Sequence, residues 1–383
     1  MPLPTLIATI PLAIWVYLFF ARGSFWRLQG DSTEPDSQTP WPRIVAIVPA
    51  RNEAETIARA VASLAKQDYP GDFSIVVVDD HSSDGTGTLA LKGAEKAPAP
   101  TRIAVHAAAE LPPGWTGKVW AMNEGVRAVA DKAPDFLWFT DADIEHAPNT
   151  LRRLVTRASN DSLDLASLMV LLQAKTFPEL LLIPPFLYFF LMLYPPRWIA
   201  DPQSRTAGAA GGCILLRRTA LDRIGGMAAI RSEVIDDCSL ARAVKNNRGK
   251  LWMGLTRESV SLRSYGSFAE IRDLIARTAF TQLRYSFFAL LGTLVALFVT
   301  YVLPLISFFS GEDPAWFLAA TAICLMAVSF GVTVRFYNLR FLWALTLPVA
   351  AMFYAYATFL SALRYWFGHG GQWKGRAQAT RGT

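Results

Sequence analysis

The sequence predicts an α/β protein in which a doubly wound, mostly parallel sheet is joined to transmembrane helices at its N- and C-terminal ends. Short apolar and β-branched runs alternate with helical patterns between residues 43 and 139. Long apolar stretches flank this region, at residues 3–21 and beyond residue 287. With 383 residues, the chain is long enough for one soluble domain and several membrane segments.

The alternating region supplies the expected elements of the sheet. Helices are expected after Asn52, from about Thr86 and over residues 118–132. Asn52 and Glu55 have the spacing of a capping box, which predicts that Asn52 caps the first of these helices. The four expected strands are residues 43–48, 74–78, 102–105 and 136–139.

The first apolar run, residues 3–21, is long enough to nearly span a bilayer. No Lys or Arg precedes it, whereas Arg22 and Arg27 follow it, so the positive-inside rule places the chain after residue 22 in the cytoplasm. The positions of Arg335 and Arg340 after the second of three later runs agree with this orientation. These later runs are residues 287–309, 315–334 and 341–363.

Two features of the apolar segments complicate this topology. Three C-terminal crossings would put the basic tail, which holds Arg364, Lys374 and Arg381, on the outer side. Either the charge rule fails there, or one of the runs lies in the membrane interface. Residues 180–194 are also apolar but are interrupted by Pro184-Pro185, which predicts a loop or short helices on the membrane surface.

The predicted organisation has four parts. A membrane anchor is followed by a linker rich in Ser, Thr, Pro and Asp, then by a soluble domain. An amphipathic helix, further transmembrane segments and a basic tail complete the chain. The boundaries of these parts are residues 1–28, 29–42, 43–270 and 271–383.

The composition excludes two other classes of protein. The net charge is +6, but Lys and Arg gather near the apolar segments, which favours a membrane surface over nucleic acid as the partner. Cys213, Cys238 and Cys324 form no C-x-x-C pair, so a zinc site or a redox dithiol is not expected. An odd number of unclustered thiols fits a reducing compartment.

Acidic residues follow three of the expected strands. Asp141 and Asp143 come directly after residues 136–139, and carboxylates at this edge of an open α/β sheet lie where such folds bind ligands. A D-x-D of this kind suits Mg²⁺ or Mn²⁺ bridging to a diphosphate. Glu53 and the Asp79-Asp80 pair should lie at the same edge, and Lys118 opens a helix where it could pair with phosphate. Neither a P-loop nor a G-x-G-x-x-G motif is present.

This order of motifs resembles the family 2 glycosyltransferases of the GT-A fold, over about residues 44–285. The resemblance implies a nucleotide-sugar donor, a UDP-sugar first among them, and Mg²⁺ or Mn²⁺ as the cofactor. It places Lys118 and Asp141 on the sugar diphosphate and Asp143, with Asp141 nearby, on the metal. It assigns the nucleotide to Pro49, Arg51, Glu53, Asp79 and Asp80.

The same resemblance implies a general base. Asp236-Asp237 precede Leu240 at the start of a helix expected to end at Asn246, and the family uses the later aspartate of such a pair. One acid at a helix start is an effective N-cap. We assign the cap to Asp236 and the base to Asp237, with the reverse assignment open.

Within the family, residues 114–118 and 140–146 and the four hydrophobic runs most resemble the bacterial hopene-associated glycosyltransferases. That resemblance implies a multi-pass inverting enzyme of the bacterial inner (cytoplasmic) membrane with a lipid-type acceptor. A processive polysaccharide synthase is an alternative, although Thr281 and Tyr285 stand where its Q-x-x-R-W motif has Gln and Trp. A non-catalytic lipid-binding scaffold on the same fold is the other alternative.

Overall fold

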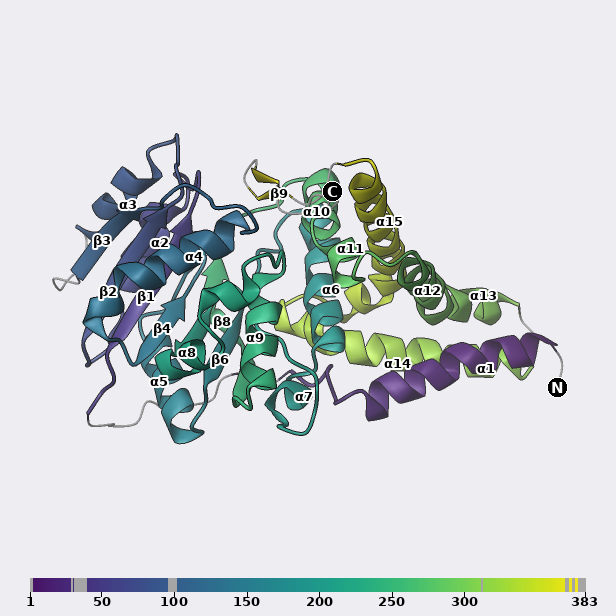
Figure 1. The fold of residues 1–383 in the computed structure, drawn as a ribbon. Helices are drawn as coiled ribbons and strands as arrows, with labels where there is room; N and C mark the ends of the chain where they lie inside the picture. The colour runs from purple at the N-terminus through teal and green to yellow at the C-terminus, as the bar shows by residue number, and fades with distance from the viewer. Residues whose placement is uncertain are drawn as a thin grey trace.

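The structure is a computed structural model in which an α/β domain lies at one end and a bundle of apolar helices at the other (Figure 1). Most of the expected linker, residues 29–42, and most of the basic tail, including Lys374 and Arg381, lie outside the described residues. The structure describes residues 3–28, 30, 40–95, 102–310, 313–368, 372–373 and 376–377.

A mixed sheet of eight strands forms the centre of the α/β domain, in the order β3-β2-β1-β4-β7-β6-β8-β5. Its first four strands are parallel to one another and are the four expected from the sequence. They are β1 (Ile44–Ala50), β2 (Phe73–Asp79), β3 (Arg102–Ala107) and β4 (Phe136–Phe139). The other half contains one parallel pair, β6–β8, and antiparallel pairs made by β7 and β5, so the sheet is mixed. Its strands are β5 (Ile144–Glu145), β6 (Leu165–Leu171), β7 (Ile214–Arg217) and β8 (Leu251–Ser261).

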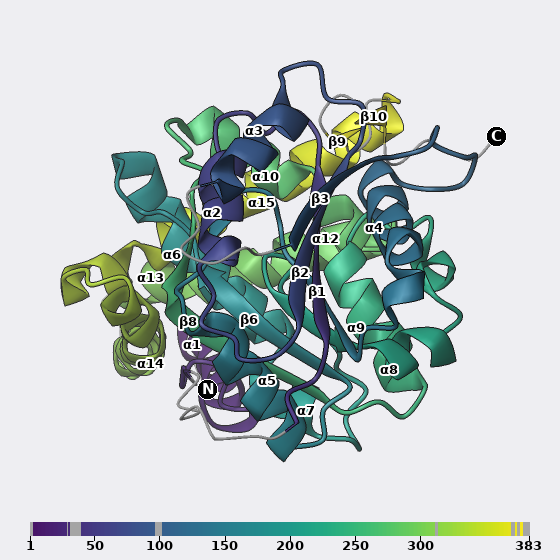
Figure 2. The same ribbon diagram turned by 90° about the vertical axis from the view of Figure 1, so that its left-hand side faces the viewer.

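Helices cover both faces of the sheet (Figure 2). Along β1, Ile44, Ala46 and Val48 join one apolar core while Val45 and Ile47 join the other, so the strand is buried on both sides. The first core includes side chains of α2 (Ile57–Ala65), α3 (Thr86–Ala94) and α5 (Thr150–Asn160). The second includes side chains of α4 (Gly117–Ala128), α8 (Arg218–Arg223) and α9 (Asp236–Asn246) and continues into the helical bundle.

The predicted cap at Asn52 is wrong. Helix α2 begins at Ile57, and Thr56 precedes it without a side-chain capping bond. Asn52 instead has a φ of 51°, and its Oδ1 accepts a hydrogen bond from the Ser83 amide at 3.0 Å. The side chain therefore ties the end of β1 to the turn after β2, a local bond that competes with helix capping.

Within the described residues, five helical stretches are long and apolar enough to cross a membrane, at residues 3–21, 177–200, 287–309, 315–336 and 341–366. Four of them correspond to the runs expected to span. They contain α1 (Leu3–Val16), α12 (Phe287–Leu297), α13 (Leu303–Phe309), α14 (Ala315–Phe336) and α15 (Leu347–Trp366).

The fifth stretch corrects the expectation of a loop or short helices at residues 180–194. It is one continuous helix, α6 (Phe177–Leu193), with Pro184 and Pro185 inside it, followed by the short α7 (Pro196–Ala200). Both prolines are buried, and α6 packs against α10 (Phe268–Ala276), α14 and α15. Packing on several sides holds the helix through the point where the prolines remove backbone donors.

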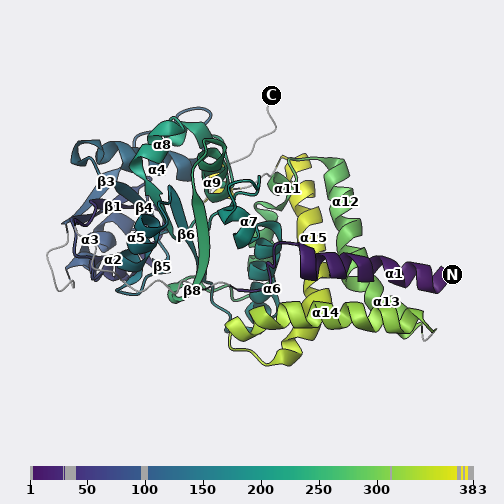
Figure 3. The same cartoon turned by 90° about the horizontal axis from the view of Figure 1, so that it is seen from below.

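The apolar helices run in two directions. Helices α1, α13 and α14 extend away from the α/β domain, whereas α6, α12 and α15 run across that direction (Figures 1 and 3). The crosswise helices α6 and α15 lie between the α/β domain and the far end of α1, so they form a layer next to the domain.

Candidate active site

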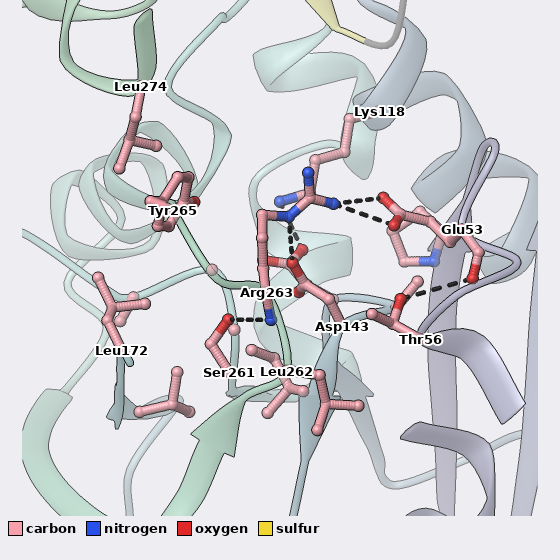
Figure 4. Close-up of a pocket in the computed structure, with 18 of the residues that line it drawn as sticks. Glu53, Thr56, Lys118, Asp143, Leu172, Ser261, Leu262, Arg263, Tyr265 and Leu274 are labelled. Atoms are coloured by element: carbon pink, nitrogen blue, oxygen red, sulfur yellow. Dashed lines mark hydrogen bonds and ion pairs between the residues drawn. The ribbon is translucent and has the colours of Figure 1, made fainter. Parts of the chain in front are cut away.

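A cavity of about 1030 Å³ opens at the carboxyl ends of β1 and β4. One part of its lining is charged and comes from loops at the sheet edge. The other part comes largely from β6, α6 and α10 and is mainly apolar, although α10 also contributes Glu270 and Asp273. Figure 4 shows this division, with Glu53 on one side and Leu172 and Leu274 on the other. The charged residues include Glu53, Lys118, Asp141, Asp143, Asp236, Asp237 and Arg263, and the apolar ones include Met169, Val170, Leu172, Phe186, Phe190 and Leu274.

The two carboxylates of the D-x-D motif face different cations. Lys118 Nζ lies 2.8 Å from Asp141 Oδ1 and 3.2 Å from Asp236 Oδ2. Burial alone would lower the pKa of the Lys118 ammonium, but the charges of Asp141 and Asp236 reverse this and raise it above its ordinary value. Lys118 is therefore a permanent positive charge between two of the predicted site residues.

Asp143 is paired with Arg263, a residue that was not predicted. Arg263 Nε donates to Asp143 Oδ2 at 2.9 Å, and its Nη2 donates to both carboxylate oxygens of Glu53 at 3.1 and 3.0 Å (Figure 4). Arg263 follows β8, a strand that the sequence reasoning did not delineate. A basic residue at the end of another strand of the same sheet is the signal that could have found it.

The carboxylates at this position fit a divalent metal only in combination with a ligand. Among the residues that the structure describes, no group of three or more His, Cys, Asp or Glu side chains is placed to hold a metal ion. Glu53 and Asp143, which share Arg263, offer oxygen ligands around one cationic group. Mg²⁺ is commonly held by one or two protein carboxylates together with substrate phosphates and water. Glu53 and Asp143 thus suit a metal ion that also binds a diphosphate. Asp141 is paired with Lys118 and does not share Arg263 with them.

The acidic pair at the start of α9 divides differently from the prediction. The N-cap of α9 is Ile235, without a side-chain bond, so the assignment of the cap to Asp236 is wrong. The charge of Lys118 draws Asp236 toward the cavity instead. Asp237 Oδ2 accepts from the Gly211 amide at 2.9 Å and Oδ1 from the Cys238 amide at 2.6 Å. Burial, and then the charge of Asp236, raise the pKa of Asp237 to about 6.

The residues assigned to the nucleotide lie together at the ends of β1 and β2. Pro49 lines the cavity, whereas Arg51, Asp79 and Asp80 are not part of its lining. Arg51 Nη1 donates to the Asp80 carbonyl oxygen at 2.5 Å and lies 3.6 Å from Asp80 Oδ2. The Asp79 carboxylate accepts from the Ser82 amide at 3.0 Å. The structure thus joins Arg51 to Asp80 and leaves this group beside the charged part of the cavity.

Buried His146 supports the D-x-D loop from behind, a role that was not predicted. Its Nε2 lies 2.8 Å from Thr140 Oγ1, and its Nδ1 lies 3.0 Å from Ser259 Oγ. Thr140 Oγ1 in turn donates to the Gly212 carbonyl at 2.9 Å. Burial lowers the pKa of His146 to about 3, so the ring is neutral near pH 7. One neutral imidazole therefore fixes the residue before Asp141.

Glu179 anchors the loop that carries Arg263, and this role was also missed. Its carboxylate is fully buried at the start of α6 and accepts four hydrogen bonds. The T-x-x-E spacing of Thr176 and Glu179 is the capping-box signal that could have marked it. The donors are the amides of Lys175, Thr176 and Tyr265, at 2.9, 2.9 and 2.6 Å, and the Ser264 hydroxyl, at 2.9 Å.

Comparison with known proteins finds a family similarity in the part of the chain that holds the first half of the sheet. Residues 45–225 match the model of the family described as "Glycosyl transferase family 2". This match runs from β1 to the end of α8, and the mixed sheet with its helices is a GT-A-like fold.

Relatives and solved structures agree with that assignment. An N-acetylglucosaminyltransferase of Mesorhizobium japonicum is 26% identical over 204 residues, which are 50% of this chain and 43% of that protein. A beta-monoglucosyldiacylglycerol synthase of Synechocystis sp. is 32% identical over 129 residues, 33% of this chain and 24% of that protein. The match thus spans less than half the length of either relative. The structure of a mannosyltransferase from Pyrobaculum calidifontis, in complex with GDP-Man and Mn²⁺, covers 94% of this chain and 99% of its own, with 21% identity and a TM-score of 0.59, which shows the shared fold.

Proposed function

We propose that this protein is a membrane-bound, metal-dependent, inverting glycosyltransferase that moves a sugar from a nucleotide-diphosphate sugar to a lipid-type acceptor. The observation that carries the proposal is one cavity that Asp237 lines together with charged residues of the sheet edge and apolar residues of β6, α6 and α10. The first part suits a charged donor and the second an apolar acceptor.

The donor is proposed to bind at the charged end. Lys118, held in its charged form, can contact the diphosphate, and Pro49, Arg51 and the carboxylates after β2 lie toward the nucleotide. Glu53 and Asp143 would hold Mg²⁺ or Mn²⁺, which when bound offsets the negative charge that grows on the leaving diphosphate. The solved mannosyltransferase of similar fold contains GDP-Man and Mn²⁺, and a UDP-sugar remains our first choice of donor here.

Asp237 is proposed to act as the base. Its carboxylate takes the proton of an acceptor hydroxyl while that oxygen attacks the anomeric carbon from the face opposite the diphosphate. The bond from the anomeric carbon to the diphosphate oxygen breaks, the nucleoside diphosphate leaves, and the anomeric configuration inverts. The amides of Gly211 and Cys238 orient the carboxylate, and general-base help of this kind is typically worth about 10² to 10⁴ in rate.

The acceptor is proposed to be a membrane lipid with a free hydroxyl. Phe186 and Phe190 of α6 and Leu274 of α10 line the cavity, and α6 belongs to one of the apolar stretches long enough to span a membrane. An apolar acceptor could therefore reach Asp237 without leaving the bilayer. The Synechocystis relative is named for a diacylglycerol lipid, and a hopanoid-type acceptor in a bacterial inner membrane follows only from the motif resemblance.

Transfer assays with a panel of donors test the proposal. Purified protein is incubated with radiolabelled UDP-glucose, UDP-N-acetylglucosamine and GDP-mannose, together with a bacterial lipid extract, and lipid products are separated by chromatography. We expect label in the lipid fraction with one donor, and loss of that label in the Asp237→Asn variant. Water-soluble polymer as the labelled product would favour the synthase alternative, and no product with any donor would contradict the proposed activity.

A further inference from the structure

We propose that Arg263 is an internal cation that holds Glu53 and Asp143 in the donor-free protein and exchanges these carboxylates for the donor's diphosphate when metal and donor bind. The inference rests on the metal-assisted donor binding proposed above. It makes Arg263 both a competitor of the metal and a ligand of the diphosphate.

The first step of the argument concerns charge. The side chains of Glu53 and Asp143 are only 13% and 17% exposed, and each makes an ion pair with the same guanidinium. Two shielded carboxylates that share one counter-charge would repel each other without it. The pKa of Arg263, which burial alone would lower, is raised by Asp143 and Glu53. Arg263 therefore supplies at this point the charge that a divalent cation would supply.

The second step concerns what can move. The Leu262 amide donates to the Asp143 carbonyl at 2.7 Å, and Glu179 binds the residues on the other side of Arg263 through Ser264 and the Tyr265 amide. The backbone is thus fastened on both sides of Arg263. Its side chain, which is 35% exposed and lines the cavity, is the part that can change partners.

The third step concerns the new partner. A divalent cation on Glu53 and Asp143 would remove the anionic partners of the guanidinium and add a repelling charge beside it. The diphosphate of a donor bound to that cation would then offer a new anionic partner in the same cavity. A guanidinium presents a planar fork of donors that fits phosphate oxygens in a bidentate manner. The same side chain can therefore neutralise the carboxylates before donor binding and the diphosphate after it.

Two binding measurements on Arg263→Gln test the exchange. The affinity for Mn²⁺ alone is measured from the electron paramagnetic resonance signal of free Mn²⁺. The affinity for UDP and GDP is measured by calorimetry at saturating Mn²⁺. Removing the competing cation should tighten Mn²⁺ binding roughly tenfold, and removing the phosphate ligand should weaken nucleotide binding roughly tenfold. Arg218→Gln is the matched control, because Arg218 pairs with Asp222 on α8 and does not line the cavity; it should change neither affinity.

The opposite signs of the two shifts separate this proposal from a merely structural role, which would weaken both affinities. Unchanged or weaker Mn²⁺ binding in Arg263→Gln overturns the proposal. If that variant does not fold, Arg263→Lys decides: equal or tighter Mn²⁺ binding with weaker nucleotide binding supports the exchange, and weaker Mn²⁺ binding overturns it. Because neither measurement needs sugar transfer, a failure of the proposed activity would appear in the transfer assay alone.

Discussion

The raised pKa of Asp237 gives the sharpest test of the proposed chemistry. Burial contributes most to the shift, the charge of Asp236 adds to it, and Lys118 opposes it, with a resulting value of about 6. A general base works only in its deprotonated form. The rate at low donor and acceptor concentrations, kcat/KM, should therefore fall as the pH drops through about 6.

The size of the effect follows from the pKa. A base with a pKa of about 6 is roughly nine-tenths deprotonated at pH 7 and one-tenth deprotonated at pH 5, so kcat/KM should fall about tenfold between these values. An aspartate with the reference pKa of about 3.9 would lose less than about a tenth of its activity over the same range. Steady-state assays in buffers of constant ionic strength between pH 5 and 8 distinguish these two outcomes.

Substitutions of the charged residues next to Asp237 should change the pH at which kcat/KM begins to fall, each in a known direction. Asp236→Asn removes a negative charge, which should lower the pKa of Asp237 and shift this fall to lower pH. Lys118→Met removes a positive charge that lowers the pKa of Asp237, so the remaining activity should fall at a higher pH than in the wild type. If Asp237→Asn keeps wild-type activity while Asp236→Asn is inactive, the base is Asp236 and the reasoning from burial fails.

The remaining predictions concern the metal, a buried histidine and the topology. A chelator should abolish sugar transfer, and Mn²⁺ or Mg²⁺ should restore it. The Asp143→Ala variant should be inactive, with a melting temperature within a few degrees of the wild type. Full activity in excess chelator would contradict the metal role. Burial lowers the pKa of His146 to about 3 in the folded protein. Below about pH 6.5 the histidine therefore binds a proton in the unfolded chain but not in the folded one, so the free energy of unfolding should fall from there down to about pH 3. Thermal melts of His146→Gln should show a shallower decline over that range, and an identical decline would refute this. In a Cys324→Ala background, a cysteine at residues 30–42 should resist a membrane-impermeant thiol reagent in intact cells, while one at residues 310–314 should react; labelling of the former would reverse the orientation.

The parallel half of the sheet could be predicted because strands buried on both faces are uninterrupted apolar runs. β1 and β4 are of this kind, and every residue of both is buried. β8 differs from them, because it carries the polar side chains Thr256, Arg257 and Glu258 in its middle. No local pattern says that β7 should lie antiparallel between β4 and β6, since that position depends on the packing of the whole domain.

The site could be predicted only where the sequence places its residues at the ends of strands or at the start of a helix. Glu53, Asp141 and Asp143 met these conditions and line one cavity. Arg263 also follows a strand, but β8 has polar residues in its middle and was not recognised as a strand, so Arg263 was missed. Asn52 shows the reverse error, since its local pattern predicted a cap while Ser83, 31 residues away, offered the better partner.

The structure also bears on the conflict between the charge rule and the basic tail. Arg364, near the end of α15, lies 2.6 Å from Asp273 of α10, which itself lines the cavity of the α/β domain. Helix α15 therefore ends on the side of that domain, and it runs across α1 and α14 rather than along them (Figures 1 and 3).

Helix α6, like α15, runs across α1 and contacts residues next to the α/β domain. Its beginning is bound to the loop that carries Arg263, and the carbonyl of Met192 near its end accepts from Arg22 Nε at 3.0 Å, next to the residues that join α1 to the domain. Both ends of α6 thus face the α/β domain. The α12–α13 segment turns from the crosswise direction of α12 to the outward direction of α13 (Figure 3). If this segment, α1 and α14 cross the membrane while α6 and α15 lie along its surface, the tail begins on the same side as the domain and the positive-inside rule holds for both. This arrangement also puts Phe186 and Phe190 of α6 at the level of the lipid head groups, where the hydroxyl of a membrane acceptor would have to enter to reach Asp237.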